Sequence, residues 1–336
     1  MRCPECNHNQ KYKDGTRCKQ CRYQFVFRKK EDQISDFTLR QIIKRLSDNG
    51  QYAFTATQLA LEICRFWRKK TLGPIGCSVI ALVVSVIGGL IVFDDWSWFG
   101  GLLCFAALLP LAIWLGRGGK GKLSFHKARD TINRYHQAHP ISELADGAAF
   151  RQQAPLEDFQ DPHYAPERIL VVERDDLVDM LIRNRFHLTA KAAVVSRTGY
   201  PARVFAVCRE FLRNHPGTPV QVIHDASAQG FALTTQLASD AQWQFARQRL
   251  VDLGISRTAL ENHSALPWLP PDQSRRDGAF GGNATERLRS GCRVPVDYVG
   301  PKPMLNLLGA AVVAGTLLLA PEILNASGAE IEIDYG

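Results

Sequence analysis

The chain has 336 residues, of which 46% are apolar and 22% charged, and its formal net charge is +8. This length and composition suit two or three folded units and exclude the fibrous and disordered classes of protein. A mean hydropathy of -0.15 is typical of a soluble protein. However, the chain also contains two adjacent apolar stretches without charge, so its hydropathy is not uniform and the average does not describe every region.

Four of the nine cysteines fall within the first 21 residues, as two C-x2-C pairs separated by 11 residues. They are Cys3, Cys6, Cys18 and Cys21. This spacing resembles a zinc ribbon and predicts a closed, structural zinc site over residues 1–30, with no open position for catalysis. Two disulfides are the alternative, which the reducing compartment inferred below disfavours. The remaining cysteines are expected to be small buried side chains; they are Cys64, Cys77, Cys104, Cys208 and Cys292.

Residues 31–70 are expected to form a helical bridge. Apolar side chains recur with helical spacing over residues 36–48, and Thr55 and Gln58 match a capping box that begins a second helix. A DNA-binding helix-turn-helix is an alternative. Packing between the ribbon and a membrane is favoured, because no recognition-helix pattern is present.

Residues 71–116 predict a transmembrane hairpin of two helices, 71–93 and 96–116. The two stretches have 23 and 21 uncharged residues, each enough to cross about 30 Å of hydrocarbon. Lysines and arginines flank both outer ends, whereas the connecting turn holds Asp94 and Asp95. The positive-inside rule therefore predicts a multi-pass protein of the inner (cytoplasmic) membrane with both flanking regions in the cytoplasm. A buried hairpin in a soluble core is the alternative. If the hairpin does span the membrane, an anchor is favoured over a transporter, because no ionisable residue lies within either span.

After a linker region, 117–166, with one expected helix near 124–137, the pattern becomes alternating short apolar runs and amphipathic segments. The strands are expected at 168–173, 192–196, 220–223 and 249–255, and the helices at 175–185 and 202–214. Repeated strand–helix–strand units predict a Rossmann-like parallel sheet with both faces covered, over residues 167–262. In such sheets function gathers at the carboxyl ends of the strands.

Three runs at these strand ends resemble a known family. They are ILVVERDDLVDMLIRNRFH (169–187), SRTGYP (196–201) and VIHDASAQG (222–230). In order and spacing they resemble the toprim domain of type IIB topoisomerase A subunits and their meiotic double-strand-break relatives. The resemblance implies a glutamate after the first strand and a D-x-D after the third, which together hold magnesium or manganese beside DNA phosphates. Glu173 matches the glutamate and Asp225 the first aspartate, but Ser227 stands in place of the second.

The departures from that family limit what the resemblance implies. A serine is a weaker magnesium ligand than a carboxylate, and nothing in the chain resembles the family's separate domain with a tyrosine nucleophile. Three interpretations of Glu173 and Asp225 stay open: structural carboxylates, a weak metal and phosphate site, or a nuclease-like centre. Ser227, Arg197 and Gly199 are the expected ligand-binding residues at the same edge.

The remainder of the chain is divided into two regions. Residues 263–303 are rich in proline, glycine and arginine and are expected to form a loop. Residues 304–336 comprise an apolar helix and an acidic tail. The apolar run 304–320 is at the lower limit of length for a membrane span, so a buried helix is favoured over a third crossing.

These features favour a membrane-anchored cytoplasmic binding or scaffold module that acts with nucleic acid, a nucleotide or a protein partner. The alternative is a divalent-metal-dependent phosphodiester or phosphoryl-transfer enzyme that uses Glu173 and Asp225. A small-ligand sensor that uses the turn at Gly199 and nearby arginines is a third possibility.

Overall fold

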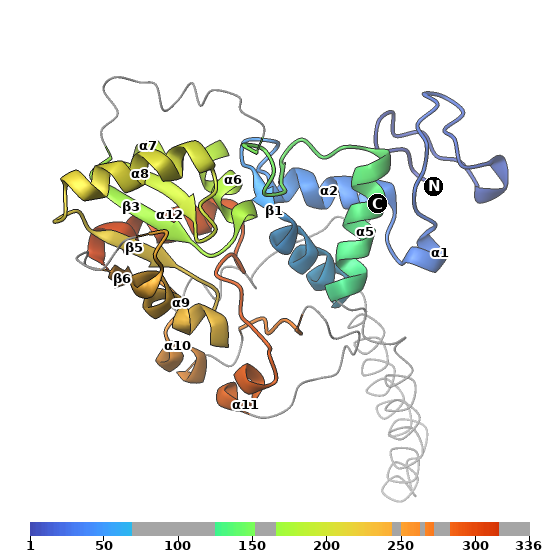
Figure 1. The fold of residues 1–336 in the computed structure, drawn as a ribbon. Coiled ribbons are helices and arrows are strands. Elements are labelled where there is room, and N and C mark those ends of the chain that lie inside the picture. Colours follow the sequence, from blue (N-terminus) through green and yellow to red (C-terminus); the bar gives the residue numbers. More distant parts are fainter. Residues whose placement is uncertain (69–124, 152–165, 244–249, 263–265, 272–282, 316–336) are drawn as a thin grey trace, which may run out of the picture.

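The structure is a computed structural model that describes residues 1–68, 125–151, 166–243, 250–262, 266–271 and 283–315 (Figure 1). The predicted hairpin at 71–116 lies outside the described residues. Among the helices that can be described, none combines the length and the apolar character needed to cross a membrane.

The first 68 residues and the region 125–151 form a largely helical part. Its elements are the short 3-10 helix η1 (Tyr12–Asp14), α1 (Lys29–Asp32), α2 (Asp36–Leu46), β1 (Phe54–Thr55), a helix over 56–68, α5 (Phe125–Ala138) and β2 (Leu144–Ala145). Ser35 caps α2, because its hydroxyl accepts a hydrogen bond from Thr38 N at 3.2 Å. Strands β1 and β2 pair in parallel, and this pairing joins segments from the two sides of the predicted hairpin.

The second part is the expected parallel α/β unit. Its strands are β3 (Arg168–Val172), β4 (Ala192–Ser196), β5 (Val220–Ile223) and β6 (Leu250–Asp252). Its helices are α6 (Asp175–Arg183), α7 (Phe186–Thr189), α8 (Ala202–Asn214), α9 (Ala228–Ser239) and α10 (Arg257–Asn262). All three pairings are parallel and the strand order is β4-β3-β5-β6, which confirms the predicted sheet (Figure 1).

Strand β3 shows why these strands are almost continuously apolar. Its alternate residues Leu170 and Val172 belong to one buried cluster, whereas Ile169 and Val171 belong to a second cluster with α8 and α9. Both faces of the sheet are therefore covered, as parallel sheets require. The first cluster continues without a break into α2 and α5, so the helical part and the α/β unit share one core.

The segment expected to be a loop, 263–303, is more ordered than predicted where the structure describes it. It contains α11 (Ala284–Arg289) and a buried return segment whose Val294 bridges Ala226. Val294, Val296 and Tyr298 are all buried. These apolar side chains alternate along the chain and pack against the strand ends. The alternation is hard to recognise in the sequence because glycines, prolines and arginines surround it.

The C-terminal helix α12 (Pro301–Ala314) packs against the sheet. Met304, Leu308 and Ala311 follow helical spacing and are buried. The helix ends at Gly315, which adopts a left-handed conformation with φ of 76°. One face of the described part of the run 304–320 is buried, and residues 316–320 lie outside the described chain, so the preference for a buried helix over a third crossing stays a prediction.

Candidate metal centre and strand-end cluster

The two C-x2-C pairs form two turns with the same backbone hydrogen bond. Asn7 N donates to Cys3 O at 3.1 Å, and Arg22 N donates to Cys18 O at 2.9 Å. Asn7 and Arg22 both have positive φ, of 60° and 63°. The same local geometry therefore occurs twice, and each copy points two sulfur atoms at the other.

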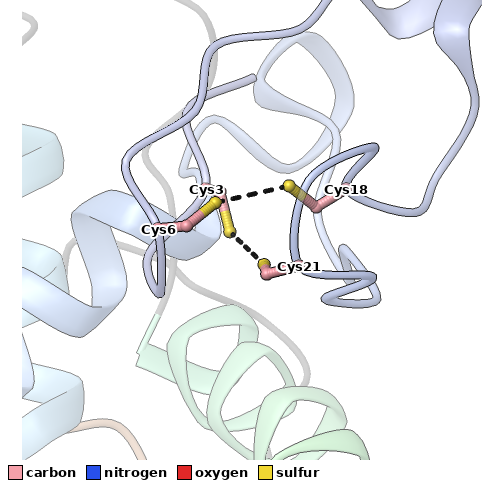
Figure 2. Close-up of side chains that lie close together, drawn as sticks. All are labelled: Cys3, Cys6, Cys18 and Cys21. Carbon is pink, nitrogen blue, oxygen red and sulfur yellow. Dashed lines mark hydrogen bonds between the residues drawn. The ribbon is translucent and has the colours of Figure 1, made fainter.

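The four sulfur atoms lie within 4.8 Å of one another (Figure 2). Cys3 Sγ is 3.4 Å from Cys21 Sγ, and Cys6 Sγ is 3.6 Å from Cys18 Sγ. A tetrahedral zinc with bonds of about 2.3 Å separates its sulfur ligands by about 3.8 Å, whereas a disulfide requires about 2.05 Å. The cluster therefore fits a structural zinc ion, as predicted, and its four cysteines are not disulfide-bonded.

The backbone around the cluster gives its thiols unequal acidity. The amide of Cys21 has the largest effect on Cys18 and helps to lower the pKa of that thiol to about 6. Burial raises the pKa of Cys3 to about 12. Because zinc binds thiolates, zinc binding at this site would displace protons, and the charge of the ion would keep Cys3 ionised in its buried position.

Tyr23 attaches the cysteine cluster to the helices. Its ring stacks on His139 with 4.3 Å between centroids, and its hydroxyl donates to Asp36 Oδ1 at 3.2 Å. Asp36 also accepts from Val26 N at 2.9 Å and Phe27 N at 3.0 Å. Burial raises the pKa of Asp36, but the carboxyl group is held by these donors at the start of α2.

The strand order brings Glu173 and Asp225 together, as expected for strand-end residues. From β3 the chain first adds β4 on one side and later β5 on the other, so the ends of β3 and β5 define the topological switch point of the sheet. Asp225 N donates to Glu173 Oε2 at 2.8 Å. Burial, followed by the charge of Asp225, raises the pKa of Glu173.

The carboxylate of Asp225 is nevertheless fully engaged by other groups. Arg174 Nη1 lies 3.3 Å from Oδ2, Arg293 Nη1 contacts the same oxygen, and Val296 N donates to Oδ1 at 2.9 Å. Asp225 is only 2% exposed. Burial alone would raise the pKa of Asp225, but the two guanidinium groups outweigh it and the pKa is lowered.

Arg174 extends this ion pair into a network. Its Nη2 lies 2.6 Å from Asp297 Oδ2 and its Nε lies 3.2 Å from Asp176 Oδ1. Asp297 is fully buried and also accepts a hydrogen bond from the Thr55 hydroxyl. The network therefore joins the helical bridge, the strand ends and the return segment after α11.

This arrangement does not fit a magnesium or manganese ion. Such an ion needs several oxygen ligands, and here both carboxylate oxygens of Asp225 already accept hydrogen bonds, Oδ2 from two guanidinium groups and Oδ1 from Val296 N. Ser227 is also engaged, because its Oγ accepts from Gly230 N at 2.8 Å and caps α9. A divalent ion at Glu173 and Asp225 thus stays a prediction that the geometry does not favour.

The other predicted binding residues shape the turn after β4. Gly199 has φ of 80°, and a Cβ there would lie 2.9 Å from the ring of Phe205. Arg197 is exposed, and its amide donates to Val172 O at 2.8 Å. Among the described contacts, none joins the Arg197 side chain to Glu173 or Asp225.

His224 is buried beside the same edge of the sheet. Its Nδ1 lies 2.8 Å from Asp225 O, and its Nε2 lies 3.0 Å from Asp252 Oδ1. Both partners are acceptors, so the two hydrogen bonds form together when both ring nitrogens carry protons. Burial alone would lower the pKa of His224, but these acceptors outweigh it and the pKa is raised.

Sequence reasoning missed Arg293 and Asp297, the two members of the network that come from the return segment. The available signal was the alternation of Val294, Val296 and Tyr298, which is typical of a buried extended segment. The dispersed cysteines were better predicted. Cys208 and Cys292 are buried and Cys64 is half-buried, while Cys77 and Cys104 lie outside the described residues.

Comparisons with protein-family models, with curated proteins and with solved structures found no match for this chain. The class defined by the fold is therefore a four-cysteine cluster joined to a parallel α/β unit. Function has to follow from the geometry of these two parts.

Proposed function

We propose that the chain is a membrane-anchored binding or scaffold module, in which a structural zinc ribbon and a toprim-like α/β unit present surfaces to a nucleic acid, a nucleotide or a protein. The anchor is the predicted hairpin 71–116, which lies outside the described residues. The proposal assigns the strand-end carboxylates Glu173 and Asp225 a structural role.

The observation that carries this proposal is the closure of the Asp225 site by Arg174 and Arg293. Removing one partner of a buried ion pair costs about 3–5 kcal/mol, because the other charge is left uncompensated. A divalent ion that displaced Arg293 would face a penalty of this kind. The arginines thus supply the positive charge that a metal would supply in a catalytic centre.

The proposal is tested by titrating Mn²⁺ into the zinc-loaded full chain in mild detergent, with free Mn²⁺ followed by electron paramagnetic resonance. We expect wild type and Asp225→Asn to give the same curve, with and without single-stranded or duplex oligonucleotides. Arg293→Ala is the positive control, because it removes one of the two guanidinium groups that contact Asp225 Oδ2 and should create weak Mn²⁺ binding that wild type lacks.

The second candidate is the divalent-metal-dependent phosphodiester or phosphoryl-transfer enzyme. The observation in its favour is that Glu173 and Asp225 are adjacent at the switch point of the sheet. Mn²⁺ binding by wild type that disappears in Asp225→Asn, together with oligonucleotide cleavage that disappears in Glu173→Gln, would establish this enzyme and remove our proposal.

A further inference from the structure

The positive charge of the chain is concentrated in the zinc ribbon. Residues 1–30 contain nine lysines and arginines and two acidic residues, a formal charge of +7 out of the +8 of the whole chain. Four thiolates and one Zn²⁺ would still leave +5. All nine basic side chains are exposed. A zinc site with only a structural role does not require such a positively charged surface.

Little of this charge is neutralised within the chain. In the part of the chain that the structure describes, ion pairs engage two of the nine basic side chains, Lys19 with Asp14 at 3.0 Å and Arg28 with Glu31 at 3.4 Å. Both pairs are solvent-exposed, so they are weak and compete poorly with an external anion. The ribbon therefore presents a positive field to its surroundings.

The ribbon also has a cavity of about 410 Å³ that combines cationic and aromatic side chains. It is lined by Tyr12, Lys13, Phe25, Phe27, Arg28 and Lys30, among others. The ring of Tyr12 is 43% exposed. Its hydroxyl accepts from Lys29 N at 2.6 Å, which fixes the ring beside the cavity.

Two kinds of polyanion could meet the ribbon, nucleic acid and anionic lipid, and its position on α5 bears on both. The ribbon contacts α5 through Tyr135 and His139, at the end of the helix opposite Phe125 (Figure 1). Phe125 is the first described residue after the predicted hairpin. At 1.5 Å per residue the ribbon lies about 15–20 Å along α5 from that point. This separation leaves room for a partner in solution, and the exposed aromatic side chain of Tyr12 favours single-stranded nucleic acid over lipid headgroups.

We propose that the zinc ribbon binds single-stranded nucleic acid, with phosphates at Lys13, Arg28 and Lys30 and a base stacked on Tyr12. Cationic grooves with exposed aromatic rings bind single strands in this way, because unpaired bases offer their faces for stacking. The inference rests on the proposed function, since it names the partner class of the binding module.

The test is fluorescence anisotropy of a labelled 12-nucleotide single strand, DNA or RNA, with the zinc-loaded full chain in neutral detergent and no added divalent metal. Affinity should fall as KCl rises from 50 to 300 mM. The double variant Lys13→Ala, Lys30→Ala should bind at least tenfold more weakly, with a salt slope smaller by about 1.4, because each phosphate contact contributes about 0.7.

The matched control is Lys44→Ala with Arg213→Ala, which removes two exposed charges from α2 and α8. It should change affinity less than twofold. Tyr12→Leu should weaken binding about tenfold, whereas Tyr12→Phe keeps the stacking ring, loses only the hydrogen bond from Lys29 N and should weaken binding less than about threefold. Zinc content and thermal unfolding confirm that each variant is folded.

Three outcomes would overturn the inference: no salt-dependent binding, equal losses in the ribbon variant and its control, or equal losses in Tyr12→Leu and Tyr12→Phe. A lipid partner is recognised by repeating the test in nanodiscs. Oligonucleotide binding is measured in nanodiscs of phosphatidylcholine and in nanodiscs that also contain phosphatidylserine. If phosphatidylserine abolishes the binding by occupying the ribbon lysines, the ribbon faces lipid and the inference also fails. The Mn²⁺ experiment tests the proposed function separately from this anisotropy experiment. Metal-dependent cleavage of the oligonucleotide there would rule out the proposed function.

Discussion

The buried His224 is held in one position by two glycines. A Cβ at Gly254 would lie 2.4 Å from the ring, and a Cβ at Gly230 would lie 2.8 Å from Nδ1. The backbone at both glycines therefore lies close against the ring. Its two hydrogen bonds, to Asp225 O and Asp252, depend on both ring protons.

We expect this ring to make stability depend on pH. Because its folded pKa is raised above 6.5, its contribution is complete below about pH 6.5 and is lost as pH rises through the folded pKa. Asp252→Asn should reduce the pH-dependent part of the free energy of unfolding by about 0.5–1 kcal/mol. The effect is small because Asp252 is about half exposed. Urea unfolding of both proteins between pH 6 and 9 measures the difference, and parallel pH profiles would contradict it.

At the scale of elements, the helix over 56–68 begins with the predicted capping box. Thr55 N donates to Gln58 Oε1 at 3.0 Å, and Gln58 N donates to Thr55 Oγ1 at 3.2 Å. The same two side chains also hold the return segment, through Asp297 and through Val299 O at 2.8 Å from Gln58 Nε2. The Ser35 cap of α2 has no long-range partner of this kind among the described hydrogen bonds.

Thr55→Ala should therefore cost more than Ser35→Ala. Loss of the Ser35 cap should lower the free energy of unfolding by about 1 kcal/mol. Loss of Thr55 should lower it by about 2–4 kcal/mol, because the buried Asp297 also loses a donor. Thr55→Ser restores the hydroxyl and should be close to wild type. Thermal unfolding of the three variants compares them, and equal shifts for Thr55→Ala and Ser35→Ala would exclude the long-range role.

Elements with a strong local pattern were predicted well. The strand 192–196 and the helix 202–214 have the bounds that the apolar pattern predicts, because the strand is a continuous apolar run and the helix shows helical spacing of its apolar residues. The return segment was missed. Its short apolar alternation is interrupted by proline, and its backbone bonds go to Ala226 and Leu269, which local sequence does not indicate.

At the scale of the molecule, the ribbon has its own small core. Cys3, Cys18, Tyr23 and Phe25 form a cluster separate from the large core that joins the helices to the sheet. A core of this size does not fold without added stabilisation. A zinc ion held by the four cysteines would therefore stabilise the ribbon, whereas the α/β unit has apolar burial of its own.

Removing one zinc ligand should separate these two parts. Cys21→Ser should reduce the zinc content from one ion per chain to near zero and remove most of the roughly 10 kcal/mol of metal-coupled folding from the ribbon. Limited proteolysis should then cut within residues 1–30, while the α/β unit stays resistant. Cys64→Ser is the control and should keep its zinc. Retention of zinc by Cys21→Ser, or its loss from Cys64→Ser, would contradict the assignment.

The sequence by itself determined the features that depend on local spacing. The two C-x2-C pairs predict the sulfur cluster, and the alternation of apolar runs predicts the parallel sheet with Glu173 and Asp225 at its edge. Only the tertiary structure decided what those carboxylates contact. Arg293 is 68 positions from Asp225, and Thr55 is 242 positions from Asp297. Such pairs form when segments distant in the sequence pack together. The local spacing of apolar residues therefore cannot predict them.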